Sequence, residues 1–489
     1  MTSPMATSQN IRRREFVRAA AAGAAVAALR TSAALGLQTT DKPAARRPNV
    51  LFLLADQWRA QATGYAGDPN VKTPRLDALA RQSTNFTNAV SGCPVCSPYR
   101  GSLMTGRYPL SHGVFLNDVC LNNDAVSLAQ AFNAAGYETG LIGKWHLDGH
   151  GRSSFVPPER RQGFRYWRAA ECTHDYNHSH YYGDRDEKQF WNGYDAIAQT
   201  EEAGQYIRKH RDEPFVLVLS WGPPHAPYRT APERFQKLYH AQDMKLRENV
   251  PKDMGAAARR DLAGYYAHCT ALDECTDRLL AVLAECGLED DTIVVFTSDH
   301  GDMLGSRGQY KKQRPWDESI RVPFLLRWPA RLGSHARELI APINAPDIMP
   351  TLLGLCGVDV PKTVEGKDRS PLLRGEMDDR DEPALIGCPS PFGQWTRQQG
   401  GREYRGVRTA RYTYIRTLEG PWLLYDNRED PFQMDNLCSR PQHAALQSEL
   451  EAQLKRRLQQ TNDDFRPGSH YIKKWGYQTD PQGTVPYTS

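Results

Sequence analysis

The segment NVLFLLADQ, residues 49–57, is the clearest indication of the fold in this 489-residue chain. Its unbroken run of Val, Leu, Phe and Ala before Asp56 predicts a strand that is buried on both faces of a sheet. Comparable apolar runs lie at residues 139–142, 215–220 and 292–297. Helical patterns lie among these runs, at residues 76–82, 126–135 and 200–210. This alternation predicts an α/β fold, in which helices sandwich a large mixed sheet of mainly parallel strands.

Polar side chains close each of the four predicted strands. In the order of the strands, these are Asp56 with Gln57, Lys144 with His146, His225, and Asp299 with His300. Parallel strands end at the same edge of a sheet, and open α/β sheets bind ligands in the crevice beyond that edge. We therefore expect residues from four distant parts of the sequence to meet in one site.

The sequence changes character beyond about residue 385. Residues 405–415 and 422–425 have the pattern of antiparallel strands, and residues 446–458 carry Leu at every fourth position, as one face of a helix does. From about Arg466 onward the chain is rich in Tyr, Pro and Gly and has no clear period. These patterns predict a small C-terminal α+β subdomain with an antiparallel sheet, followed by an irregular tail.

A twin-arginine export signal is predicted at the N-terminus. The pair Arg13-Arg14 precedes an apolar run at residues 19–29, which is about half of the roughly 20 residues that span a bilayer. The pattern is typical of a bacterial signal peptide that is recognised by the twin-arginine translocase, and it predicts a periplasmic or secreted protein. An Arg-rich amphipathic start of a cytosolic protein is the alternative. The first cysteine is Cys93, so a lipoprotein anchor is not expected. The apolar run is too short for a membrane-spanning anchor, so no permanent membrane anchor is expected either.

The sequence predicts three parts of the chain. They are the signal peptide at residues 1–36, the α/β domain at residues 37–384, and the C-terminal subdomain with its tail at residues 385–489. The signal segment holds five Arg and one Glu, which account for the formal net charge of +4. The mature chain is then close to neutral, which argues against a nucleic-acid partner.

Three motifs carry a family resemblance. They are CSPYRGSLMTGR at residues 96–107, GYETGLIGKWH at residues 136–146, and SDHG at residues 298–301 with Lys312 beyond it. The first resembles the sulfatase signature C-x-P-x-R leading into L-x-T-G, and the others resemble further blocks of that family. With Asp56-Gln57, the resemblance spans most of residues 48–440. It implies an alkaline-phosphatase-like fold and a hydrolase of sulfate monoesters, either of a small molecule or, as we expect, of a sulfated carbohydrate.

The resemblance implies that Cys96 is oxidised to formylglycine by a maturation enzyme and works as the hydrate. One hydroxyl would attack sulfur, and loss of the other hydroxyl's proton would expel sulfate. The alternative for Cys93-Pro94-Val95-Cys96 is a redox pair or half a zinc site. No second C-x-x-C completes a zinc site, and Pro98 suits the first turn of a helix that would place residue 96 at an anion-binding N-terminus.

Sulfate esters are anions that repel an oxyanion nucleophile, so such a site needs positive charge. By resemblance, Arg100 steadies the nucleophile, while Lys144 and Lys312 bind sulfate oxygens. His146 would take the proton whose loss releases sulfate. His225 would protonate the leaving oxygen, sharing that work with Lys312.

A divalent cation is expected beside residue 96. Asp56, Gln57 and Asp299 offer oxygen ligands, which suit Ca²⁺. His300 adds a nitrogen, so Mg²⁺ and Mn²⁺ stay open as alternatives. Many sulfatases are described with an acidic residue in place of Gln57 and an amide in place of His300.

Three further interpretations stay open at the level of sequence. Residues 172–182 are dense in His and Tyr, and they form a substrate loop at the pocket mouth, a plain surface loop or a second metal site. The function is alternatively that of a phosphonate monoester or phosphodiester hydrolase of the same superfamily, or of a non-catalytic protein that binds sulfated glycans. Lys144 and His146 favour the sulfatase, because the phosphonate hydrolases are expected to carry uncharged hydroxyl residues there.

Overall fold

The structure is a computed structural model that describes residues 47–378 and 382–487. The predicted twin-arginine signal at residues 1–36 lies outside the described residues and stays a prediction. Within the described ranges, every helix is too short or too polar to cross a membrane.

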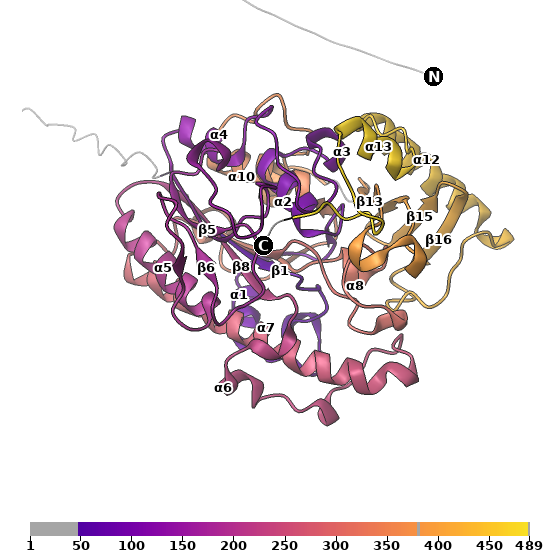
Figure 1. Cartoon of the computed structure of the whole chain (residues 1–489), viewed down its shortest axis with the longest axis horizontal. Helices are drawn as coiled ribbons and strands as arrows, with labels where there is room; N and C mark the ends of the chain where they lie inside the picture. Colours follow the sequence, from indigo (N-terminus) through magenta and orange to yellow (C-terminus); the bar gives the residue numbers. More distant parts are fainter. Residues whose placement is uncertain (1–46, 379–381, 488–489) are drawn as a thin grey trace, which may run out of the picture. The chain divides into compact units, whose positions relative to one another are not determined.

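An eight-stranded sheet organises the fold (Figure 1). Its strands, in spatial order, are β11 (Arg337–Leu339), β2 (Thr84–Phe86), β10 (Phe324–Arg327), β9 (Thr292–Ser298), β1 (Asn49–Asp56), β8 (Phe215–Pro224), β4 (Glu138–Lys144) and β5 (Tyr166–Ala170). Within this sheet, only β10 is antiparallel to its neighbours, β9 and β2. The prediction of a mixed, mainly parallel sheet is therefore confirmed.

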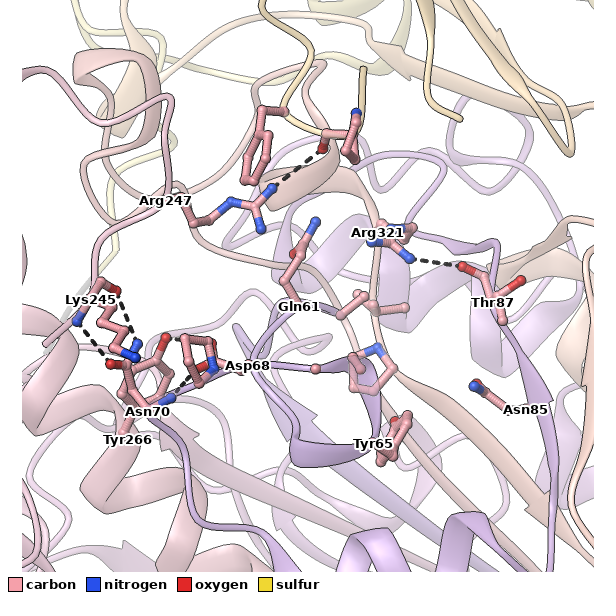
Figure 2. A pocket seen from close by; sticks show the side chains of 18 of the residues that line it. Gln61, Tyr65, Asp68, Asn70, Asn85, Thr87, Lys245, Arg247, Tyr266 and Arg321 are labelled. Atoms are coloured by element: carbon pink, nitrogen blue, oxygen red, sulfur yellow. Dashed lines mark hydrogen bonds between the residues drawn. The ribbon is translucent and has the colours of Figure 1, made fainter. Parts of the chain in front are cut away.

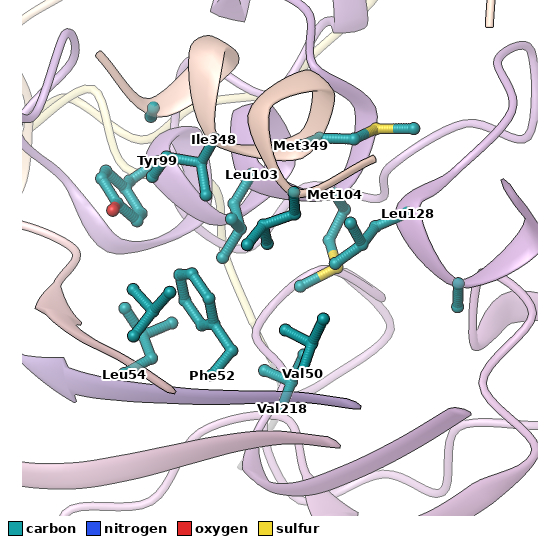
Figure 3. Close-up of a cluster of buried hydrophobic side chains, with 14 of the residues drawn as sticks. Val50, Phe52, Leu54, Tyr99, Leu103, Met104, Leu128, Val218, Ile348 and Met349 are labelled. Carbon is teal, nitrogen blue, oxygen red and sulfur yellow. The ribbon is translucent and has the colours of Figure 1, made fainter. Parts of the chain in front are cut away.

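Two layers of helices cover the faces of the sheet, and β1 contributes to both cores. Its side chains at 50, 52 and 54 pack against one layer, and those at 51 and 53 pack against the other. Figure 3 shows the first core, in which Phe52 points toward Leu103 and Ile348. The first layer comprises α2 (Cys96–Thr105), α4 (Leu128–Ala134) and α10 (Ala345–Cys356), and the second comprises α1 (Pro74–Ala80), α5 (Asp195–Lys209) and α7 (Gly255–Glu285). Burial on both faces explains why β1 is apolar until Asp56.

Short elements connect these layers. The helices are α3 (Pro109–His112), α6 (Glu233–Gln236), α8 (Asp317–Ile320), α9 (Pro329–Leu332) and α11 (Ser370–Arg374). The two-residue strands are β3 (Ala89–Val90), paired with β12 (Ile343–Asn344), and β6 (His180–Tyr181), paired with β7 (Gln189–Phe190). The His- and Tyr-rich segment 172–182 thus ends in a short strand, although its sequence has no strand pattern.

A second, antiparallel sheet follows in the C-terminal part of the chain. Its four strands are β13 (Ala384–Cys388), β14 (Tyr404–Arg408), β15 (Tyr412–Thr417) and β16 (Gly420–Asp426). Helix α12 (Ala444–Gln460) covers the sheet with the buried Leu450 and Leu454. The predicted antiparallel sheet and its covering helix are confirmed, whereas the domain boundary near residue 385 stays a prediction.

The predicted irregular tail is partly wrong, because Gly468–Trp475 forms helix α13. The helix is only eight residues long, which is too short to show a period in sequence. Its stability comes from distant partners: Tyr471 packs edge-on against Phe115 with a ring separation of 6.2 Å. Just after the helix, the Tyr477 hydroxyl donates to the Gly113 carbonyl at 2.9 Å.

Candidate active site

The polar residues that close the central strands meet at the carboxyl edge of the sheet. Asp56 ends β1, Lys144 ends β4, His225 follows β8 and Asp299 follows β9. Cys96 is the first residue of α2, as the position of Pro98 predicts. None of the ten predicted site residues exposes more than 7% of its surface. Their charged groups are therefore removed from water and need charged or hydrogen-bonding partners.

Four of these residues form a cluster of potential metal ligands. The ligand atoms of Asp56, Cys96, Asp299 and His300 all lie within 4.8 Å of one another. His300 Nε2 is 3.6 Å from Asp56 Oδ1 and 3.5 Å from Asp299 Oδ1. The ligand oxygens of Asp56 and Asp299 lie within 4.8 Å of each other. Two carboxylates this close repel each other, so a cation between them is favourable.

Gln57 fits the same cluster. Its Nε2 donates to Asp302 Oδ2 at 2.6 Å, and its backbone N–H donates to Asp299 Oδ1 at 3.0 Å. The remaining amide atom, Oε1, is buried and has no hydrogen-bond partner among the described residues. A buried carbonyl oxygen without a hydrogen-bond partner is unfavourable unless it binds a ligand such as a metal ion. The donor set of two carboxylates, one amide oxygen and one imidazole thus suits a divalent cation.

Asp302 is a site residue that sequence reasoning missed. By accepting from Gln57 Nε2 it fixes which amide atom of Gln57 is left free. It also accepts from the Tyr228 hydroxyl at 2.5 Å and from the Lys311 backbone at 2.8 Å. The only sequence signal was its position directly after the motif at residues 298–301.

Three cations surround position 96. Lys312 Nζ lies 3.0 Å from Cys96 Sγ. Lys144 Nζ lies 2.6 Å from Asp56 Oδ2. Arg100 links the two metal-site carboxylates, since its Nη2 lies 3.3 Å from Asp56 Oδ2 and 3.0 Å from Asp299 Oδ2.

These cations change the pKa of the acidic groups between them. Burial raises the pKa of Asp56, but Lys144 and the other cations outweigh it and hold that pKa well below its usual range. Burial and Asp56 likewise oppose ionisation of the Cys96 thiol, yet Lys144 and Lys312 hold the thiol pKa well below its usual range. The surroundings therefore stabilise an anion at position 96.

His146 is held by a partner that the sequence did not reveal. Its Nε2 lies 3.2 Å from Asp118 Oδ1, and Arg152 donates to both oxygens of Asp118 at 2.8 Å. Burial lowers the pKa of His146, but the ionised Cys172 thiolate and the Asp118 carboxylate raise it to about 9. Asp118 and Arg152 lie outside all three motifs, so nothing in the sequence pattern pointed to them.

The His- and Tyr-rich segment 172–182 reaches the site. The ring of His174 stacks on the ring of His225, with centroids 4.5 Å apart and planes 19° apart. His225 Nε2 in turn lies 2.9 Å from Lys312 Nζ. Both clusters of potential metal ligands in residues 47–378 and 382–487 lie outside segment 172–182, so its geometry favours a loop beside the site over a second metal site.

The arrangement can cleave an ester of an anionic acid. A side chain at the N-terminus of a helix stands beside three cations and a set of ligands for a divalent cation. Such groups stabilise the negative charge that develops when a nucleophile attacks sulfate or phosphate. The fold and the site therefore define a hydrolase of anionic esters.

Comparison with known proteins identifies the family. Residues 48–358 match the family described as Sulfatase, and residues 305–460 match N-sulphoglucosamine sulphohydrolase, C-terminal. This chain belongs to the sulfatase family and is a sulfuric ester hydrolase. Enzymes of this family generally use a metal ion and a formylglycine that is made from Cys.

Individual relatives cover most of the chain. It is 46% identical over 449 residues to the Ulvan-active sulfatase of Formosa agariphila, covering 90% of this chain and 86% of the relative. It is 32% identical over 458 residues to the Endo-4-O-sulfatase of Bacteroides thetaiotaomicron, covering 80% and 88%. A crystal structure from Bacteroides fragilis, described as that of a sulfatase, superposes with a TM-score of 0.78 at 33% identity, covering 89% and 100%.

Proposed function

We propose that this sulfatase removes sulfate monoesters from a polysaccharide, with a formylglycine hydrate at position 96 as the nucleophile. One observation carries the proposal: Cys96 Sγ lies 3.0 Å from Lys312 Nζ and 3.2 Å from His300 Nε2, inside the buried cluster. Cys96 is the unmodified precursor, so Sγ marks the atom that conversion to formylglycine replaces by oxygen.

The reaction has two steps at residue 96. One hydroxyl of the hydrate loses its proton and attacks sulfur, so an oxygen–sulfur bond forms while the ester bond to the alcohol breaks and the alcohol takes a proton. The second hydroxyl then loses its proton and becomes the aldehyde oxygen, while the carbon–oxygen bond to sulfate breaks. Water adds back to the aldehyde, so the net reaction is ester plus water to alcohol plus sulfate.

The basic residues divide the work of binding sulfate. Lys144 and Lys312 bind its oxygens, and Arg100 holds the nucleophile and the metal-site carboxylates in place. The short distances from Lys312 Nζ to position 96 and from Lys144 Nζ to Asp56 Oδ2 support these roles. Fixed charges in a buried site stabilise the transition state without reorganisation of solvent.

Two histidines transfer the protons. His225 protonates the leaving oxygen together with Lys312, which lies 2.9 Å from its Nε2. In its neutral form His146 accepts the proton whose loss releases sulfate, and Asp118 orients its ring from 3.2 Å. Because the pKa of His146 is raised to about 9, this step is expected to speed up as pH rises toward 9. A histidine positioned by a carboxylate is the usual arrangement for general acid–base catalysis.

Asp56, Gln57, Asp299 and His300 would hold a divalent cation together with residue 96. The prevalence of oxygen donors makes Ca²⁺ our first choice, while the nitrogen of His300 keeps Mg²⁺ and Mn²⁺ open. When bound, the cation would supply positive charge to the sulfate and to the nucleophile.

The substrate class and the compartment are part of the proposal. The relatives' names, Ulvan-active sulfatase and Endo-4-O-sulfatase, support a sulfated polysaccharide such as ulvan. The Arg13-Arg14 pair supports export through the twin-arginine translocase to the periplasm or beyond. A formylglycine-generating enzyme would act on Cys96.

Sulfate release from ulvan, from chondroitin sulfate and from 4-nitrophenyl sulfate tests this function. We expect all activity to depend on Cys96 and the polysaccharides to be better substrates than the aryl ester. Activity confined to the aryl ester would contradict the proposed substrate class.

A phosphonate or phosphate diester hydrolase is the second candidate, because a metal set with Gln57 and His300 resembles that group. Lys144 and His146 argue against it, because phosphonate hydrolases are expected to carry uncharged hydroxyl residues at these positions. Both side chains are buried in the site. Turnover of an aryl phosphonate that exceeds turnover of the aryl sulfate would favour the second candidate.

A further inference from the structure

A cavity of about 650 Å³ is lined by residues other than the ten of the candidate active site (Figure 2). Its walls come from residues 60–61 and 65–70 after β1, 85–87 in and after β2, 245–248 before α7, 321–323 before β10, 338 in β11, and 431–432, with Tyr266 of α7. We name it the Gln61 cavity. Its volume is within the range of sites that bind small molecules or single sugar units.

Gln61 is the feature that points to a ligand. The residue is 8% exposed, and neither its Oε1 nor its Nε2 has a hydrogen-bond partner among the described residues. In the view of Figure 2, its side chain lies between Arg247 and Arg321. A buried primary amide without partners is unfavourable. A ligand that both donates and accepts, as a sugar hydroxyl does, would satisfy both amide atoms.

Part of the cavity wall is aromatic, and side chains of the wall are held in place. The Tyr266 hydroxyl donates to Asp68 Oδ2 at 2.6 Å, which fixes its ring. The Arg247 guanidinium lies 4.7 Å from the centre of the Phe432 ring and donates to Glu318 Oε1 at 2.9 Å. Side chains that are ordered before binding lose little entropy when a ligand enters.

The charges around the cavity favour an uncharged ligand. Its lining holds three cations and three carboxylates, namely Lys245, Arg247, Arg321, Asp68, Glu248 and Glu338. Two of the cations also have carboxylate partners outside the lining, since Arg247 pairs with Glu318 and Arg321 with Asp317. The catalytic site instead concentrates Arg100, Lys144 and Lys312, as an anionic ester requires.

We propose that the Gln61 cavity binds an uncharged sugar unit of the same polysaccharide whose sulfate ester enters the catalytic site. The inference rests on the proposed function, because it assumes a polymeric substrate. Two contacts on one chain raise the effective concentration of the ester at the catalytic site. The cavity therefore lowers the KM for a polymer and has no effect on a small aryl sulfate.

The experiment measures binding and turnover separately. Affinity electrophoresis of the Cys96→Ala protein measures its binding of chemically desulfated ulvan. Because this protein lacks the nucleophile, the measurement is independent of catalysis. Gln61→Met removes the amide at similar length, and Ala66→Trp fills the cavity from an exposed position of its lining. We expect each change to weaken this binding by about fivefold or more, and to raise the KM for ulvan by about three- to tenfold in the active enzyme.

The controls separate this inference from the proposed function. Gln205→Leu changes an exposed glutamine of α5, far along the chain from the cavity lining, and is expected to leave binding unchanged. Turnover of 4-nitrophenyl sulfate stays within about twofold in both cavity variants, because this ester does not reach the cavity. The inference would be overturned if desulfated ulvan did not bind, or if it bound equally well to all variants. If the unaltered enzyme released no sulfate from any of the substrates, the proposed function would be overturned, whereas the binding result would stay intact.

Discussion

Lys312 is the residue on which the proposed chemistry at position 96 depends most directly. Its ammonium contacts both Cys96 and His225, so in the proposed mechanism it supplies charge to sulfate and a proton path to the leaving oxygen. We expect Lys312→Ala to reduce kcat for 4-nitrophenyl sulfate by about 10²–10³, because a fixed charge in the transition state is lost. Lys311→Ala is the matched control, since only the backbone of Lys311 donates to Asp302, and steady-state kinetics should show a change within about threefold. Near-normal turnover by Lys312→Ala would remove Lys312 from the mechanism.

At the scale of the element, the contact between β4 and β8 sets the position of Lys144. Gly143 has φ +99°, and a Cβ added there would lie 2.1 Å from the Ser220 carbonyl oxygen. Only glycine permits this approach of the two strands. The strand pair and the position of Lys144, the last residue of β4, are therefore coupled.

Gly143→Ala should lower the melting temperature by several degrees and reduce kcat by about tenfold, because Lys144 moves with the strand. Thermal unfolding and kinetics measure the two effects. Gly193→Ala is the control, since Gly193 has φ +70° and nothing within 4 Å of an added Cβ. An equal loss of stability in both variants would show that the backbone angle, and not the close contact, is responsible.

Helix α5 begins with a buried carboxyl group, Asp195, whose Oδ1 has no partner among the described residues. Burial raises the pKa of Asp195 to about 8, against opposing hydrogen bonds from Ser179 and the Ala196 backbone. The unfolded chain loses this proton at lower pH than the folded protein does. Stability from this group is therefore complete below the unfolded pKa and is lost as pH rises from about 4 to 8.

Asp195→Asn removes this titration. We expect the variant to melt at a higher temperature than the unaltered protein at about pH 8.5, with the difference shrinking toward pH 4. Asp212→Asn, at an exposed position just after α5, should show no such dependence on pH. A difference that is constant with pH would contradict a neutral Asp195.

Across the chain, local sequence pattern predicted the elements whose apolar face is continuous. Strand β1 was predicted because every residue from Val50 to Ala55 is apolar, and the convergence at its end follows from strand direction alone. Helix α13 was missed because its Tyr471 packs against Phe115 and its Trp475 lies against Gly113, contacts that no local pattern records.

The same distinction holds for the site. Residues within motifs, such as Lys144 and Asp299, could be named from sequence. Asp118 could not, because the link to the site that the described residues show is the side-chain contact with His146, 28 positions away. The Gln61 cavity likewise depends on segments that meet only in the folded chain, and composition gives no sign of it.

The proposed mechanism requires that residue 96 is formylglycine in the mature enzyme. Mass spectrometry of the tryptic peptide covering residues 82–100, from protein purified from its own host, tests this requirement. Conversion of the thiol to the aldehyde lowers the peptide mass by roughly 18 Da, and we predict this loss in active enzyme. An active enzyme whose peptide carries the full mass of Cys96 would contradict a formylglycine nucleophile.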